Sequence, residues 1–213
     1  MPLQNRVAPD GTIFATPARG MLMGNRGGQL HDGARQLTQR RWASRQWISC
    51  VLQYKDRHET IMAPGRYTQL FFLDEATALA AGHRPCALCR RADFLTFMQH
   101  WQALHGLGER PKVAVVDGQL HQERIGEDRG KRIYSSPLAK LPHGVMIASA
   151  DGPQLYWGGK LLAWSPSGYG APAAAKTNAH VNVLTPPSIV AVLAAGYAPL
   201  LHPSARSMSL PKS

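Results

Sequence analysis

The sequence contains little cysteine and no long hydrophobic run, and each shortage excludes a class of protein. Three cysteines among 213 residues are too few for a disulfide framework, which excludes a small disulfide-stapled secreted domain. The N-terminal residues contain no apolar segment of the kind found in signal peptides, so none is expected. The longest apolar run, residues 189–201, is interrupted by Gly196 and Pro199 and is too short to cross a bilayer. We therefore expect a cytoplasmic protein with no membrane partner.

Acidic residues are also scarce. The 13 Asp and Glu residues face 24 Lys and Arg residues, which gives a net charge of +11 and an isoelectric point near 10.1. Such an excess attracts polyanions, most often nucleic acid, although it also serves simply to keep a protein soluble. With 44% hydrophobic and 17% charged residues, the chain is typical of a globular protein rather than a disordered one.

Two of the cysteines stand close together in the stretch GHRPCALCRR. Cys86 and Cys89 form a CxxC pair, and two thiolates at this spacing bind one Zn²⁺, which needs two further ligands to complete a tetrahedron. The upstream candidates are Cys50, in a predicted strand, and His58, in the turn after it; His83, beside the pair, is a further alternative. A redox dithiol and inert thiols remain the other interpretations of the pair.

The pattern around the CxxC pair predicts alternating strands and helices. Strands are expected at residues 47–55 and 67–74, and a short helix follows Asp74, a good N-cap, and ends at Gly82. A longer helix is expected over residues 88–105, with the apolar side chains at helical spacing facing the core. These side chains are Phe94, Phe97, Met98, Trp101 and Leu104.

The chain is expected to fold as an α+β protein with a zinc-knuckle-like lobe and a mostly β C-terminal lobe. The predicted parts are a basic Gly/Pro-rich arm without regular structure over residues 1–34, the strand-helix-CxxC-helix lobe over 35–108, the β lobe over 109–203 and a frayed tail over 204–213. Within the β lobe, residues 109–140 form a polar stretch, a hairpin is expected at Gly158-Gly159 and a loop over 165–176. A helix over residues 187–195 is expected to be capped by Thr185.

The stretch FFLDEATALAAGHRPCALCRR resembles the second half of the Ada-type zinc module, over about a tenth of the chain. The shared features are an aromatic strand, a short helix ending in AAG, and RPCxxC followed by basic residues. In that family four cysteines bind zinc, and one of them accepts a methyl group from a DNA phosphotriester. The resemblance implies Zn²⁺ bound by Cys86 and Cys89. The upstream CxxxC pair of the family is absent, since Tyr54 stands four residues after Cys50; a methyl acceptor here would need Cys50 to be both zinc-bound and exposed.

The whole chain also resembles an uncharacterised family of proteobacterial proteins. The shared stretches include GNRGG, RRWASR and HRPC followed by CRRAD. This resemblance implies a bacterial protein and no particular activity.

Arginines recur in two parts of the sequence, where they are candidates for phosphate contacts, with Trp42 and Trp47 as candidates for base stacking. The tryptophans are alternatively core residues beneath an exposed arginine face. The candidate nucleic-acid-binding residues are Arg35, Arg40, Arg41, Arg45, Arg84, Arg90 and Arg91.

The main prediction is therefore a zinc-stabilised, basic protein that binds nucleic acid. The alternative is a metal-dependent phosphoester hydrolase or nuclease, built from two histidine–acid pairs. The pairs are His31 with Asp32, and His121 with Glu123. This alternative requires the four side chains to converge in one site.

Overall fold

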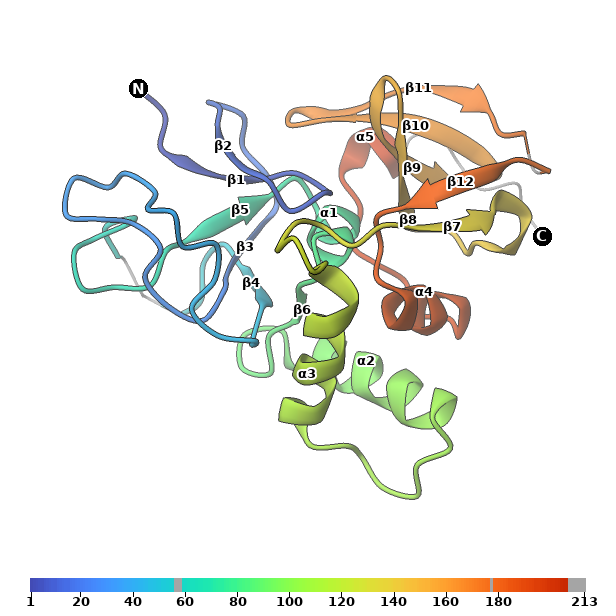
Figure 1. Ribbon diagram of the computed structural model, residues 1–213, viewed down its shortest axis with the longest axis horizontal. Helices are drawn as coiled ribbons and strands as arrows, with labels where there is room; N and C mark the ends of the chain where they lie inside the picture. Colours follow the sequence, from blue (N-terminus) through green and yellow to red (C-terminus); the bar gives the residue numbers. More distant parts are fainter. Residues whose placement is uncertain (56–58, 177, 207–213) are drawn as a thin grey trace.

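The computed structural model describes residues 1–55, 59–176 and 178–206, and it confirms the α+β class (Figure 1). Two six-stranded sheets lie side by side, with α1 between them and α2, α3 and α4 below them in this view. The helices are α1 (Glu75–Ala80), α2 (Arg91–Leu104), α3 (Val113–Arg124), α4 (Pro187–Ala194) and α5 (Pro203–Arg206), with a 3-10 turn η1 (Leu138–Lys140).

The first sheet has the strand order β2-β1-β5-β3-β4-β6. Its strands are β1 (Gln4–Val7), β2 (Ile13–Ala15), β3 (Leu22–Asn25), β4 (Ile48–Val51), β5 (Leu70–Phe72) and β6 (Arg84–Pro85). The expectation of an arm without regular structure over residues 1–34 is wrong, because β1, β2 and β3 lie there. The predicted strands over 47–55 and 67–74 are present as the shorter β4 and β5. They are not neighbours, since β3 pairs with both.

The second sheet has the order β11-β10-β9-β8-β12-β7. Its strands are β7 (Tyr134–Pro137), β8 (Val145–Ser149), β9 (Gly152–Trp157), β10 (Lys160–Ser165), β11 (Gly168–Ala174) and β12 (His180–Val183). The hairpin at Gly158-Gly159 is confirmed, because β9 and β10 pair antiparallel on either side of it.

Two predictions for the C-terminal half are wrong, and the polar stretch 109–140 contains elements that were not predicted. The predicted loop over 165–176 contains β11, and the stretch 109–140 contains α3 and β7. Thr185 does not cap α4, because its hydroxyl accepts a hydrogen bond from the Met146 N–H (2.9 Å) in the second sheet and Pro186 is the N-cap. Of the tail expected to fray, residues 204–206 belong to α5, and 207–213 lie outside the described residues.

Helix α1 is the common core element of the two sheets. All its residues are buried, and its alanines contribute to the apolar cluster of each sheet. As predicted, Asp74 caps the helix by accepting a hydrogen bond from the Thr77 N–H (2.9 Å). Gly82 follows the helix with a φ of +86°, a conformation that glycine adopts readily. The segment after α1 therefore turns back towards the edge of the first sheet, where it forms β6 and presents the CxxC pair.

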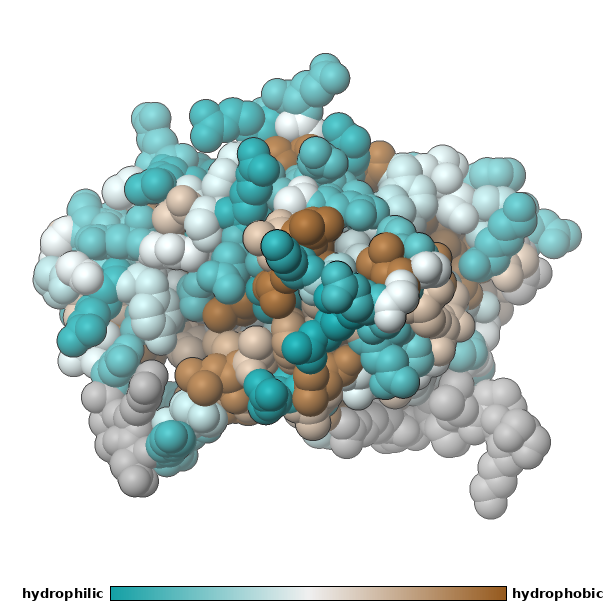
Figure 2. Space-filling model, turned by 90° about the horizontal axis from the view of Figure 1, so that it is seen from below, coloured by the Kyte–Doolittle hydropathy of each residue, from teal (hydrophilic) through white to brown (hydrophobic). Residues whose placement is uncertain are grey.

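Helix α2 is amphipathic, as the sequence predicts, although it begins at Arg91 rather than at residue 88. Phe94, Phe97, Met98 and Trp101 are buried in a core shared with α3, α4 and the second sheet, whereas Leu104 is 45% exposed. Figure 2, the view from below, shows the face that carries these helices: apolar side chains appear as separate patches among hydrophilic ones. Within the described residues, no helix combines the length and the apolar character needed to cross a membrane.

Candidate metal centre

Two backbone features bring the three cysteines together. Strand β4 pairs parallel with β6, with Ser49 opposite Pro85, so that Cys50 and Cys86 follow side by side. The Cys86 N–H donates to the Ser49 carbonyl (2.9 Å), which fixes the start of the CxxC turn against β4. The turn then places Cys89 close to both, and the three Sγ atoms lie within 4.8 Å of one another. Cys50, Cys86 and Cys89, hereafter the cysteine cluster, therefore have the spacing of ligands to a single metal ion.

The three thiols of the cysteine cluster differ in pKa. The Cys50 thiol donates to Cys86, which lowers the pKa of Cys86 to about 5; N–H groups of the CxxC turn, including that of Leu88 (3.4 Å from Sγ), also favour the thiolate. The pKa of Cys50 is raised by the same hydrogen bond and by burial, and that of Cys89 is raised by burial. A thiolate is thus already favoured at Cys86, and a bound cation would displace the remaining thiol protons.

The cluster lies at the wall of a pocket of about 750 Å³, which all three cysteines line. Cys89 is partly exposed, whereas Cys50 is only 8% exposed. Tyr54, at the position where the Ada-type pattern would have a cysteine, lines the same pocket. The exposed Cys50 that a methyl acceptor would require is therefore not found.

The fourth ligand is not among the residues brought together here. The candidate His58 lies outside the described residues. The alternative His83 is completely buried and packs against Phe72 and Trp47, with ring centroids 4.7 and 5.0 Å away. Its Nε2 accepts a hydrogen bond from Arg26 (3.4 Å). His83 is therefore a core residue rather than a metal ligand.

The four residues of the hydrolase alternative do not form one site. Within residues 1–55, 59–176 and 178–206, the one group of His, Cys, Asp or Glu side chains with metal-binding spacing is the cysteine cluster. His31 is 2% exposed and is held by the Thr68 hydroxyl (2.6 Å) and the Ala63 carbonyl (3.2 Å). Asp32 accepts hydrogen bonds from N–H groups within its own loop.

The other pair of that alternative is also divided, because its two members contact different elements. His121 packs against Trp42 and Trp47 and contacts Arg124 (3.1 Å). Glu123 instead accepts hydrogen bonds from Ser188 at the start of α4. The convergence that a metal-dependent hydrolase at these residues requires is therefore absent.

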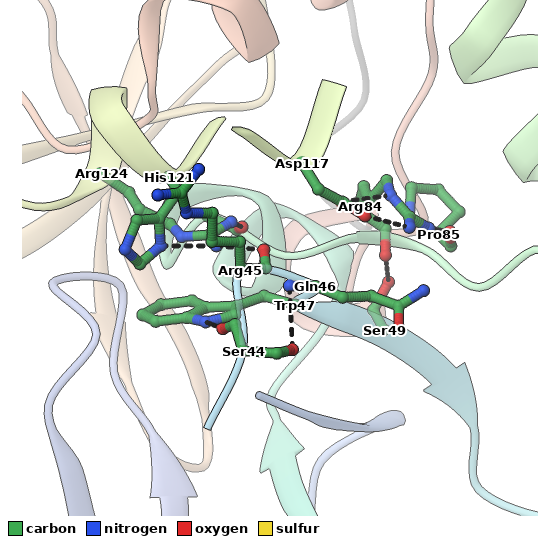
Figure 3. A network of polar contacts seen from close by, with 11 residues as sticks. Ser44, Arg45, Gln46, Trp47, Ser49, Arg84, Pro85, Asp117, His121 and Arg124 are labelled. Atoms are coloured by element: carbon green, nitrogen blue, oxygen red, sulfur yellow. Dashed lines mark hydrogen bonds and ion pairs between the residues drawn. The ribbon is translucent and has the colours of Figure 1, made fainter. Parts of the chain in front are cut away.

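The candidate phosphate-binding arginines divide into exposed and buried groups. Arg84 and Arg90 are buried, so their prediction as phosphate contacts is wrong. Arg84 forms two hydrogen bonds with Asp117, each 2.8 Å, and Figure 3 shows Asp117 projecting from α3 towards Arg84. Arg90 pairs with Glu75 and Asp93. The remaining candidates are exposed: Arg35, Arg40, Arg41, Arg45 and Arg91.

A second basic group was missed by the sequence analysis. Arg26 and Arg124 both lie against Trp47, each with its guanidinium carbon 4.0 Å from the ring centroid (Figure 3 shows Arg124 beside the indole). Trp47 is therefore a core residue, as the alternative interpretation of the tryptophans predicted. The only sequence signal for the arginines was their place in GNRGG and QLHQER, which did not indicate that they meet.

Comparisons with known proteins add no relative to this description. The chain matches no protein-family model, no curated protein and no solved structure. The cysteine cluster is therefore the feature from which a function is inferred.

Proposed function

We propose that the protein binds Zn²⁺ through the cysteine cluster, with His58 as the fourth ligand, and that its basic surface binds nucleic acid. The observation that carries the first part is the approach of three Sγ atoms to within 4.8 Å of one another. Thiolates are preferred ligands of zinc, and structural zinc sites are tetrahedral and closed by protein ligands.

Zinc in this position would supply structural cross-linking rather than chemistry. Cys50 belongs to β4, whereas Cys86 and Cys89 precede α2. A metal bound to all three joins the edge of the first sheet to the helix that forms the shared core. Because β4 and β6 share few backbone pairs, the metal would contribute much of the stability of this edge.

The test is the metal content of the full-length protein purified without chelators. We expect about one zinc per chain in the wild type, by the stoichiometry of such sites, and loss of zinc in Cys86→Ser. His58→Ala should weaken zinc binding, measured by competition with a chromophoric chelator. Asp32→Asn serves as a control, because this exposed residue of the hydrolase alternative lies outside the cluster. A folded wild type without metal would refute the zinc proposal.

Nucleic-acid binding is supported by charge and exposure. The net charge is +11, and the exposed residues Arg35, Arg40, Arg41 and Arg45 belong to one segment between β3 and β4. Arginines arranged in this way contact backbone phosphates without reading sequence, and each such contact makes binding more sensitive to salt.

Fluorescence anisotropy with a labelled DNA duplex, measured at several salt concentrations, tests this part of the proposal. We expect Arg40→Ala/Arg45→Ala to weaken binding and to reduce the slope of log K against log salt by about one per lost contact. Lys160→Ala removes an exposed charge of the second sheet and should leave the slope close to wild type. Equal effects of the two variants would indicate non-specific attraction by net charge and would overturn the assignment of this segment.

A further inference from the structure

Three cationic side chains meet beside Trp47 around a small pocket, hereafter the basic pocket. Arg26, Arg124 and Lys131 line it together with the partly exposed Trp42, and its volume is about 170 Å³. Arg41 and Arg129, both exposed, also line it. Arg26 and Arg124 are only 2% and 1% exposed. The pocket therefore combines a buried cationic floor with an exposed cationic margin.

The buried cations are held by neutral acceptors rather than by carboxylates. Arg26 donates to the carbonyls of Gly11 (2.8 Å) and Arg41 (3.3 Å). Arg124 donates to the carbonyls of Gly82 (2.8 Å) and Arg45 (2.6 Å). None of the ion pairs found within the described residues includes Arg26, Arg124 or Lys131.

Two further observations indicate that the positive charge is incompletely compensated. The Nε of Arg124 is buried and has no hydrogen-bond partner within the described part of the chain. Burial, together with repulsion by neighbouring arginines, lowers the pKa of both Arg26 and Arg124 to about 9. Lys131 donates to the Ala80 carbonyl, and burial and the same two arginines lower its pKa to about 7. Asp10, which lines the pocket, offsets this repulsion only in part.

Burying several cations close together with only the partial compensation that Asp10 and Asp117 provide is unfavourable in a folded protein, and a bound anion would relieve it. We propose that the basic pocket binds the dianionic phosphate group of a phosphate monoester. Guanidinium groups match phosphate oxygens in geometry and form charge-assisted hydrogen bonds with them. The pocket is large enough for several water molecules, and therefore for a phosphate group. A terminal phosphate can enter such a recess, whereas the phosphodiesters inside a strand are flanked on both sides by nucleosides.

The monoester can belong to a small molecule or to the 5′ end of a nucleic acid, and both present the same dianion. Trp42 is only partly buried beside the pocket, with the Arg129 guanidinium carbon 5.2 Å from its ring centroid. It can pack against the group attached to the phosphate in either case. The proposal depends neither on zinc nor on the side chains of Arg40 and Arg45, which do not line the pocket; Arg41 and Trp42 of the same segment do line it.

The first test is isothermal titration calorimetry of the full-length protein with AMP and, as a control, adenosine. We expect binding of AMP and at least tenfold weaker binding of adenosine, because one charged hydrogen bond contributes about that factor. A pair of oligonucleotides of one sequence, with and without a 5′-phosphate, identifies the source. If the 5′-phosphate strengthens oligonucleotide binding at least tenfold over the unphosphorylated oligonucleotide, the ligand is a nucleic-acid end; if the two oligonucleotides bind equally while AMP binds, it is a small monoester.

Variants of single pocket residues locate the binding. Lys131→Gln should weaken AMP binding about tenfold, and Arg129→Gln, at the exposed margin, provides a second variant with little effect on folding. Arg132→Gln is the matched control, because this exposed neighbour does not line the pocket; it should bind AMP as the wild type does. Equal binding of AMP and adenosine, or AMP binding unaffected by both pocket variants, would overturn the proposal. If Arg40→Ala/Arg45→Ala leaves DNA binding unchanged, the AMP result is not affected. The two proposals can therefore be refuted independently of each other.

Discussion

The ion pair between Arg84 and Asp117 offers a quantitative test of how the CxxC segment is held. The two side chains are joined by two contacts of 2.8 Å, and they are 1% and 8% exposed. Asp117→Ala leaves the Arg84 guanidinium buried, with the Pro85 carbonyl as its remaining hydrogen-bond acceptor among the described residues. Removing one partner of such a pair costs about 3–5 kcal/mol. Asp117 also attracts Arg124, so its loss adds to the repulsion in the basic pocket.

Equilibrium unfolding in urea measures this loss, provided that the m-value stays constant. Asp151→Ala, at an exposed turn of the second sheet, is the control and should change the free energy of unfolding by less than about 0.5 kcal/mol. Arg84→Met/Asp117→Leu should recover most of the loss, because an apolar pair leaves no unpaired charge. A loss below about 1 kcal/mol in Asp117→Ala, typical of an exposed ion pair, would refute the reasoning.

Three further predictions concern backbone conformation, pH and metal. Gly82→Ala places a methyl group at a φ of +86° and 2.5 Å from the Arg124 side chain. Calorimetry should show that the free energy of unfolding falls by about 2 kcal/mol or more. An unchanged melting temperature would contradict this. The pKa of Lys131 is lowered from 10.5 to about 7, by burial and by Arg124 and Arg26 against the attraction of Asp10. Between pH of about 7 and 10.5 the unfolded chain therefore binds more protons than the folded protein, and the free energy of unfolding should rise with pH in this window. Lys131→Met should flatten this rise, measured by urea titrations at several pH values in the window. A profile identical to that of the wild type would exclude Lys131 as the source of the rise. Removal of zinc by a chelator should lower the melting temperature reversibly, since a ligand of the folded state stabilises it; a metal-depleted protein that melts at the same temperature would show that metal does not stabilise the fold.

The sequence predicted those elements whose signals are local. Asp74, the alanine-rich stretch and Gly82 specify a cap, a helix and its end within one short segment, and the structure has all three. The CxxC pair is likewise local, which explains why Cys86 and Cys89 were found. Their approach to Cys50 depends on the pairing of β4 with β6, for which the sequence carries no separate pattern.

The errors arose where distant partners decide the outcome. β1, β2 and β3 are three or four residues long, too short for a clear alternation of apolar and polar residues. Helix α3 begins with Val113, and its β-branched residues disfavour a helix by propensity alone; packing of Val116 and Leu120 in the core supports it. Arg84 was assigned to the surface because Asp117, its partner 33 residues away, cannot be identified from local sequence.

The position of α1 between the sheets has a consequence for synthesis of the chain on the ribosome. The Glu75 carboxylate accepts hydrogen bonds from the Tyr197 hydroxyl and the Leu200 N–H, and Asp74 accepts one from the His202 N–H. These partners stand 122 to 128 residues later in the sequence. Until those residues are made, Glu75 has its ion pair with Arg90 and Asp74 has its contacts with Thr77, but both carboxylates lack their remaining partners. The first sheet can therefore assemble around α1 in its final form only after residues 197–202 have left the exit tunnel.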